Sequence, residues 1–260
     1  MDFEVCFLPG EATRRPSPVA VLIDVIRAST TIVTLLDRGA PEVVLVRQAD
    51  LTKLAEIRAK VGAALVCAED ASGVQAAVAE LSPSPAALRD LDLSGQRVIF
   101  STTNGTLAAA LLQQAGVEHV LIGCMRNGVA VMAEAVALAR RLDRSISLVC
   151  AGRHGCQIPA VDDVYCAATL LRHGEEQAKS AGITATLLES AKIARAASTV
   201  FSGAHEAFDQ SMSAAVVRRI GAPDDVPYCA DENVTRCVPR VTFKDGAVLV
   251  HKAGKAGGAS

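Results

Sequence analysis

Three stretches of the chain share a pattern in which a short apolar run ends in a cluster of small polar residues, an acid or an arginine. They are residues 21–31, 98–106 and 148–153, and a helix-like segment follows each one directly or after a short loop. Short apolar runs bounded by polar residues are typical of buried strands. The pattern therefore predicts an α/β protein whose polar chemistry lies at the carboxyl ends of strands.

The first half of the chain contains a weak internal repeat. Residues 24–46 fall on residues 101–123 when shifted by 77 positions, so that Asp24 meets Ser101 and Arg27 meets Asn104. Each copy predicts a strand, a polar turn, a helix, a glycine and a second strand. The predicted helices are Thr31–Asp37 and Leu107–Gln114. Their expected N-caps are Ser29 and Thr106, and the glycines expected to end them are Gly39 and Gly116. Any two strand–helix–strand units look alike, and this alternative to a true repeat stays open.

The other segments are predicted from the same two periodicities. Helices are expected at 52–61, 129–141, 162–173 with Gly174 as its stop, most of 183–202, and 204–220. Strands are expected at 64–67, 146–149, 227–230, 238–243 and 248–251, with a hairpin turn at Asp245-Gly246. Residues 71–95 are rich in Ala, Ser and Pro and predict a loop or lid, and 252–260 predict a flexible tail.

Length and composition fit this fold class. Half of the 260 residues are apolar and none is Trp, which suits one or more mostly parallel sheets covered by helices. We expect residues 1–260 to form one functional unit, with two related lobes, about 1–125 and 126–250, as an option.

Charge and cysteine usage exclude several classes of partner. The net charge of −2, with both signs interspersed, gives no basic surface for nucleic acid. No apolar run approaches the roughly 18 residues of a membrane span, and the N-terminus lacks the basic region of a signal peptide. The eight cysteines form no Cys-x-x-Cys pair, so we expect them reduced and buried in a cytoplasmic protein. The sequence leaves the oligomeric state open, with a homo-oligomer as one option.

Charged residues at the predicted strand ends are the first candidates for chemistry. Asp24, Asp162 and Asp163 offer the oxygen ligands that Mg²⁺ prefers, although acids in a first helical turn also simply cap the helix. Arg27 and Arg153 offer planar forks for phosphate oxygens, with a surface ion pair as the alternative for each.

Neutral groups at the same turns would complete an anion site. Backbone N–H groups at helix starts and hydroxyl donors favour phosphate, and we expect about half of these side chains to touch substrate while the rest cap helices. The candidates for substrate binding are Ser29, Thr30, Thr102, Thr103, Asn104, Gly105, Thr106 and Gly152. Further acids that could join a metal site are Glu69, Asp70, Asp231 and Glu232.

Four of these motifs, in the same order along the chain, resemble the 2-phosphosulfolactate phosphatase (ComB) family. They are Asp24–Thr31, Ser101–Thr106, Cys150–Arg153 and Asp162–Ala167, and later pieces at Asp225–Ala230 and Val238-Pro239 are also similar. The resemblance implies an α/β fold and a Mg²⁺-dependent phosphatase that acts on a small phosphorylated sulfonate. On this basis the catalytic residues would be Asp24, Arg27, Arg153 and Asp163, and the metal ligands Asp24, Asp162 and Asp163.

One departure and two alternatives accompany this interpretation. Residues 73–88 lack the Gly-Asn-Ser-Pro element of the family, which leaves the natural substrate open. Arg153-His154-Gly155 follows an apolar strand, as the phosphorylated histidine of histidine phosphatases does, but a convincing second histidine is missing. A protein that only binds a phosphorylated metabolite, or an inactive relative, is the alternative of a different class.

Overall fold

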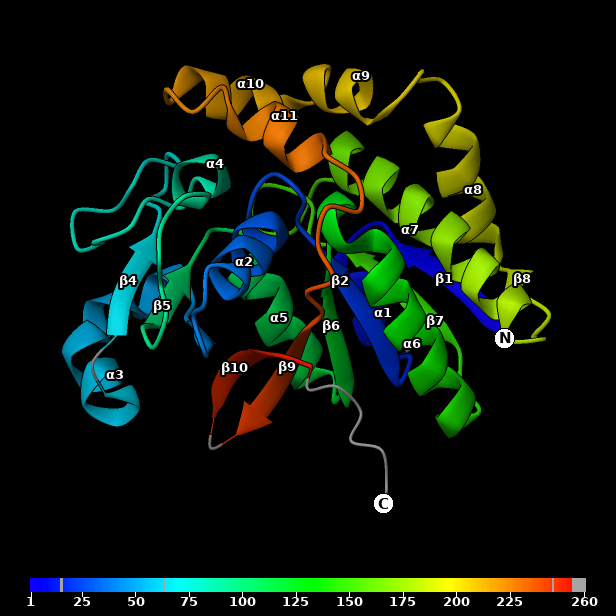
Figure 1. Cartoon of the computed structure of the whole chain (residues 1–260), viewed down its shortest axis with the longest axis horizontal. Coiled ribbons are helices and arrows are strands. Elements are labelled where there is room, and N and C mark those ends of the chain that lie inside the picture. Colours follow the sequence, from blue (N-terminus) through cyan, green and yellow to red (C-terminus); the bar gives the residue numbers. More distant parts are fainter. Residues whose placement is uncertain (15, 63, 245, 254–260) are drawn as a thin grey trace.

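The computed structural model describes residues 1–14, 16–62, 64–244 and 246–253 (Figure 1). Its strands are β1 (Asp2–Cys6), β2 (Val19–Ile23), β3 (Val43–Leu45), β4 (Ala64–Ala68), β5 (Arg97–Ser101), β6 (His119–Gly123), β7 (Ile146–Cys150), β8 (Thr186–Leu187), β9 (Pro239–Lys244) and β10 (Ala247–Lys252). Its α-helices are α1 (Pro9–Arg14), α2 (Ala28–Asp37), α3 (Leu54–Val61), α4 (Pro85–Leu88), α5 (Gly105–Gln114), α6 (Gly128–Leu142), α7 (Val161–Ser180), α8 (Glu189–Ser198), α9 (Ala204–Asp209), α10 (Met212–Arg219) and α11 (Asp225–Ala230). Short 3₁₀ helices occupy Gln48–Lys53 and Met125–Asn127.

All ten described strands form one mostly parallel sheet in the order β4-β5-β3-β10-β9-β6-β2-β7-β1-β8. This confirms the predicted α/β class. Two parallel blocks, β4-β5-β3 and β6-β2-β7-β1-β8, run in opposite directions, because the antiparallel hairpin β9–β10 is inserted between them. Strand β1 pairs with β7, so strands from both sides of residue 125 lie in the same block.

The two copies of the internal repeat exchange their strands. The first copy is β2–α2–β3 and the second is β5–α5–β6, and β2 pairs in parallel with β6 while β3 pairs in parallel with β5. The helix starts of the two copies therefore come together: a Cβ placed on Gly105 would lie 2.6 Å from the Cβ of Ala28, its equivalent in the repeat. This arrangement brings the carboxyl ends of β2 and β5 to one site although they belong to opposed blocks.

The predicted N-caps of both repeat helices are wrong. The capping positions are Arg27 and Asn104, and neither side chain caps its helix. Ser29 and Thr106 lie inside the first helical turn, where their hydroxyls accept hydrogen bonds from the backbone N–H groups of Asp24 (3.2 Å) and Thr102 (3.4 Å). The hydroxyls thus tie each helix to the end of the preceding strand.

Five expectations in the rest of the chain also need correction. The helix from 162 does not stop at Gly174 but continues to Ser180, and residues 204–220 form two helices, α9 and α10, with Ser211 capping the second. Residues 227–230 belong to helix α11 rather than to a strand, and the 71–95 segment contains the short helix α4. Residues 183–202 contain β8 as well as α8. Asp245 and residues 254–260 lie outside the described part of the chain.

Helices cover the sheet and one end of it. In Figure 1, α9, α10 and α11 lie together across the top, above α2, where α11 also contacts α4. The eight cysteines are buried and free, as predicted. Among the described residues, no helix is long and apolar enough to span a membrane.

Candidate active site

A cavity of about 400 Å³ lies where the three predicted polar segments meet. Its walls come from the loops after β2, β5 and β7, from the 69–73 segment after β4, and from one face of α10. The predicted site residues that line it are Asp24, Arg27, Thr102, Thr103, Asn104, Gly152, Arg153, Asp162 and Asp163. The predicted convergence of these segments is confirmed, because they meet at a single cavity.

Three buried carboxylates form one side of the cavity, which we call the acidic floor: Asp24, Asp162 and Asp163. Their exposed fractions are 8%, 1% and 2%. Burial, reinforced by the negative charge of Glu69, raises the pKa of Asp24 to about 7, and burial raises the pKa of Asp162 to about 6. Burial and then the charges of its two neighbours raise the pKa of Asp163 well above its ordinary value. Ionising all three carboxyl groups is therefore costly unless a cation lies beside them.

Asp163 also joins two strand ends. One carboxylate oxygen accepts the backbone N–H of Val25 and the other accepts that of Gly152, both at 2.9 Å. Because Val25 follows β2 and Gly152 follows β7, this carboxylate sets the relative position of two neighbouring loops. The sequence indicated Asp163 as a candidate acid but did not predict that its carboxylate joins two loops.

Asp24 and Thr102 leave unused oxygen atoms beside Gly105. A Cβ on Gly105 would lie 2.9 Å from Asp24 Oδ2 and 3.4 Å from Thr102 Oγ1. The Thr102 hydroxyl is buried and has no hydrogen-bond partner among the described residues. Only glycine at position 105 lets the start of α5 approach these two oxygen atoms so closely.

Arg27 is engaged in buried ion pairs. Its guanidinium donates to Glu69 Oε2 at 3.0 Å, to Asp225 Oδ2 at 3.2 Å and to the Gly73 carbonyl at 2.6 Å. Glu69 in turn accepts the backbone N–H of Thr103 at 2.9 Å. Arg27 thereby links the first repeat turn to the second and to α11, and little of its charge remains for an anion.

The loop after β7 has an unusual backbone that presents Arg153. Gly152, His154, Gly155 and Cys156 all have positive φ angles, between 52° and 68°. The Asn104 side-chain carbonyl accepts the N–H of Gly155 at 3.0 Å, which holds this loop against the β5–α5 turn. No carboxylate among the described residues lies within 4.0 Å of an Arg153 nitrogen, although the charge of Arg153 acts on Asp162. Arg153 is therefore available for an anion.

Four predicted substrate-binding residues do not line the cavity. Ser29 and Thr106 bind strand-end backbone as described above, Thr30 donates to the Val25 carbonyl at 2.8 Å, and Gly105 begins α5 behind Asp24. They shape the turns that present the other groups.

Sequence reasoning missed the residues that reach the site from distant segments. Arg219 and Ser213 of α10 line the cavity, and Ser213 donates to Asp162 Oδ1 at 3.0 Å. Asp225 is fully buried and was seen only as part of a motif. Ser213 and Arg219 in a short, mostly apolar helix carry no chemical signal by themselves, so only the fold could place these groups.

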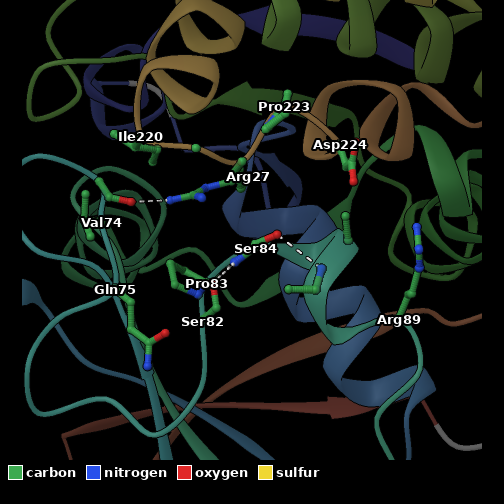
Figure 2. A pocket seen from close by; sticks show the side chains of 15 residues that line it. Arg27, Val74, Gln75, Ser82, Pro83, Ser84, Arg89, Ile220, Pro223 and Asp224 are labelled. Carbon is green, nitrogen blue, oxygen red and sulfur yellow. Dashed lines mark hydrogen bonds between the residues drawn. The ribbon is translucent and has the colours of Figure 1, made fainter.

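A second cavity of about 420 Å³ lies on the other side of Arg27 (Figure 2). The 73–75 and 82–87 segments line it together with Arg89 and the 220–224 loop. Arg27, Gly73 and Pro83 border both cavities. The segment that departs from the family pattern therefore forms walls on both sides of Arg27.

Comparison with known proteins identifies the family. The model of the 2-phosphosulpholactate phosphatase family matches residues 6–244. The chain belongs to the 2-phosphosulfolactate phosphatase family. A probable 2-phosphosulfolactate phosphatase of Deinococcus radiodurans is 33% identical over 231 residues, which cover 87% of this chain and 89% of that protein. The 2-phosphosulfolactate phosphatase of Methanothermobacter thermautotrophicus is 30% identical over 232 residues, covering 89% of each chain.

Membership of the 2-phosphosulfolactate phosphatase family gives the enzyme class. The chain is a phosphoric monoester hydrolase, which disfavours the alternative of an inactive binding protein. His154 is the only histidine among the described residues that line the cavity. A second histidine, which histidine-phosphatase chemistry needs, is therefore missing from the described lining.

The geometry also tests whether a metal ion fits. Among the described residues, no three His, Cys, Asp or Glu side chains are arranged as a ready-made metal site. Mg²⁺ does not need such a set, because it is commonly held by one or two carboxylates, substrate phosphate and water. Among the described residues, the unpartnered Thr102 hydroxyl, the free Asp24 oxygen and the three clustered carboxylates of the acidic floor fit this mode.

Proposed function

We propose that this enzyme hydrolyses 2-phosphosulfolactate to sulfolactate and phosphate and requires Mg²⁺. The observation that carries the proposal is the acidic floor of Asp24, Asp162 and Asp163 beside the unpaired Arg153 in one cavity. A dianionic phosphate would be repelled by such a floor unless a cation neutralised it. The names of the relatives support the choice of substrate, and the charged groups of the cavity support the need for a cation.

In this proposal Asp24 and Asp162 are the main ligands of Mg²⁺, and Asp163 contributes charge while it holds the two loops. Bound Mg²⁺ would neutralise the phosphate oxygens and polarise the ester for attack. Arg153 binds a phosphoryl oxygen, because its planar guanidinium matches phosphate and lacks a competing carboxylate. Thr103 and Asn104 lie beside it as neutral donors at the start of α5.

Hydrolysis breaks the bond between phosphorus and the ester oxygen, and the leaving alkoxide takes up a proton. Carboxyl groups whose pKa lies near neutrality suit proton transfer, and the acidic floor contains such groups. The new bond to phosphorus forms with a water oxygen, or with an Asp24 oxygen in an aspartyl phosphate that water then hydrolyses to release phosphate. Arg27 acts as a positioning residue, since it orients Glu69 and thereby the Thr103 turn.

The unpaired, buried cysteines support a cytoplasmic location, which is part of the same proposal. A screen of small phosphorylated acids tests the function. We expect phosphate release from 2-phosphosulfolactate to exceed that from 2-phospholactate, and both to depend on Mg²⁺. Release from neither acid at any Mg²⁺ concentration, in a folded protein, would remove the proposed substrate class. A clear preference for 2-phospholactate would assign the altered 73–88 walls to a different substrate.

A further inference from the structure

Helix α10 presents one face to the cavity and carries an arginine at its end. The cavity-lining residues of this helix are Met212, Ser213, Val216, Val217 and Arg219, which recur at helical spacing. Arg218 lies on another face of the helix. Its guanidinium pairs with the Asp209 carboxylate and donates to the Asp209 backbone carbonyl. The two neighbouring arginines therefore differ in direction, and only Arg219 faces the site.

The backbone of α10 is fixed above the acidic floor. Ser213 donates to Asp162, and Val217 is 4% exposed. The Gly73 turn lies against the same helix: a Cβ on Gly73 would be 3.4 Å from Ile220 Cδ1 and 3.9 Å from Val216 Cγ1. Arg219 thus extends from a well-packed helix, while its own side chain is exposed and, among the described residues, has no carboxylate within 4.0 Å.

The charged groups of the cavity fall into two sets: those of the loops and the α7 start around the acidic floor, and Arg219 on α10. The carboxylates lie at the strand ends, where Arg153 and a bound cation would receive the phosphate. Arg27 is already neutralised by Glu69 and Asp225. The carboxylate and sulfonate of 2-phosphosulfolactate would be repelled by the acidic floor, so they would point toward α10, where Arg219 is the available cation.

We propose that Arg219 binds the anionic group of the substrate that is not transferred, and so restricts the enzyme to small phosphomonoesters that carry a second acid group. This inference rests on the proposed function. Guanidinium forms paired hydrogen bonds with carboxylate and sulfonate oxygens. Because Arg219 belongs to α10 and not to the segments that carry the acidic floor and Arg153, it would contribute to binding and selectivity more than to the chemical step.

Binding of sulfolactate, the product that lacks phosphate, tests the inference without turnover. We expect Arg219→Gln to weaken sulfolactate binding by about tenfold or more in calorimetry, as loss of a charge-assisted pair does. Inorganic phosphate, measured with Mg²⁺ present, should bind with a change of less than about twofold, because Arg153 and the bound cation would hold it. Arg218→Gln is the matched control, and it should change neither affinity.

Kinetics provide the second readout. The ratio of kcat/KM for 2-phosphosulfolactate to kcat/KM for p-nitrophenyl phosphate should fall about tenfold or more in Arg219→Gln, mainly through KM. Equal losses on both substrates, or equal weakening of sulfolactate and phosphate, would show a structural or phosphate-binding role and overturn the inference. Sulfolactate that does not bind to the wild-type enzyme would overturn it as well. If sulfolactate binds through Arg219 but 2-phosphosulfolactate is not hydrolysed, the proposed function fails and the binding role of Arg219 survives.

Discussion

The β2–α2 turn and the β5–α5 turn occupy equivalent positions in the internal repeat and line the same cavity. In both, a hydroxyl of the first helical turn accepts a backbone N–H at the strand end: Ser29 in one and Thr106 in the other. Their chemistry differs. The first turn carries Asp24 and Arg27, whereas the second carries Ser101 and Asn104 at the equivalent positions.

The neutral turn has no charged side chain at these two positions. Ser101 is buried with no hydrogen-bond partner among the described residues, and Asn104 holds the Arg153 loop. The charged turn combines a floor carboxylate with a buried ion-pair network. The repeat therefore provides one scaffold twice, and catalysis is concentrated where charged side chains replace the neutral ones.

The largest expected effect is on turnover, and it follows from the difference in charge between the two turns. Asp24→Asn should lower Mg²⁺-dependent turnover at least about a hundredfold, roughly 2.7 kcal/mol of transition-state stabilisation, with the fold intact. Ser101→Ala, at the equivalent position, should change turnover little, because its hydroxyl makes no hydrogen bond. Steady-state kinetics and circular dichroism check both variants. Near wild-type turnover of Asp24→Asn at saturating Mg²⁺ would exclude Asp24 from the mechanism.

The buried network of the charged turn predicts a loss of stability. Asp225→Asn removes the charged acceptor of Arg27 and should lower the free energy of unfolding by about 1.5–3 kcal/mol, as for hydrogen bonds to charged groups. Asp231→Asn is the control, because Asp231 pairs with Arg126 while 47% exposed, and exposed pairs contribute about 1 kcal/mol or less. Urea unfolding of both variants tests this. Equal losses would show that the burial of the Arg27 network has no energetic consequence.

The contact between the two helix starts can be tested by exchanging side chains. Gly105→Ala places a Cβ 2.6 Å from Ala28 Cβ and 2.9 Å from Asp24 Oδ2, and should destabilise the protein by about 1–3 kcal/mol. It should also weaken Mg²⁺ binding. The double variant Ala28→Gly/Gly105→Ala should recover part of the stability but not the Mg²⁺ affinity, since the Asp24 contact remains. Gly10→Ala, in open space, is the control. A fully functional Gly105→Ala enzyme would contradict this geometry.

The raised carboxyl pKa values predict that the stability of the metal-free protein depends on pH. Asp24 has a pKa of about 7 when folded against an ordinary value of 3.8, and Asp162 about 6. The unfolded chain therefore releases these protons at a lower pH than the folded protein does. The contribution of these two groups to the free energy of unfolding is full below about pH 4 and is lost as pH rises toward 7. Asp24→Asn should flatten the dependence of the melting temperature on pH across this window, whereas Ser101→Ala should not. An unchanged slope in Asp24→Asn would contradict the buried, uncompensated floor.

Much of the fold could be predicted because its strands and helices carry strong periodicity, but two local signals were misleading. Gly174 suggested a helix end, yet it lies within α7, where a Cβ would be 2.7 Å from Phe3 Cε1 and 2.8 Å from Met132 Cε. Pro227 in an apolar run suggested a strand, but Pro is tolerated in the first turn of a helix, and α11 begins two residues earlier. In both cases tertiary packing decided against the local pattern.

The candidate site was predictable where it depends on strand ends. Asp24 and Arg153 were visible because each follows an apolar strand, and Asp163 because it lies in the first turn of a predicted helix and in a family motif. Arg219 and Asp225 were not, since their positions depend on how α10 and α11 pack over the sheet. Arg27 shows the converse: its motif marked the site, but its partners Glu69 and Asp225 come from segments 42 and 198 residues away.

Phosphate release from 2-phosphosulfolactate in Mg²⁺ and in EDTA, by the wild-type enzyme and by His154→Ala, tests the central claim most directly. If the acidic floor acts through Mg²⁺, EDTA abolishes wild-type activity, and His154→Ala in Mg²⁺ loses no more than about tenfold, which is less than the roughly 10²–10⁴-fold contribution of an acid–base group. The result that would contradict the account is activity that persists in EDTA and disappears with His154, because phosphohistidine chemistry needs the imidazole and no metal.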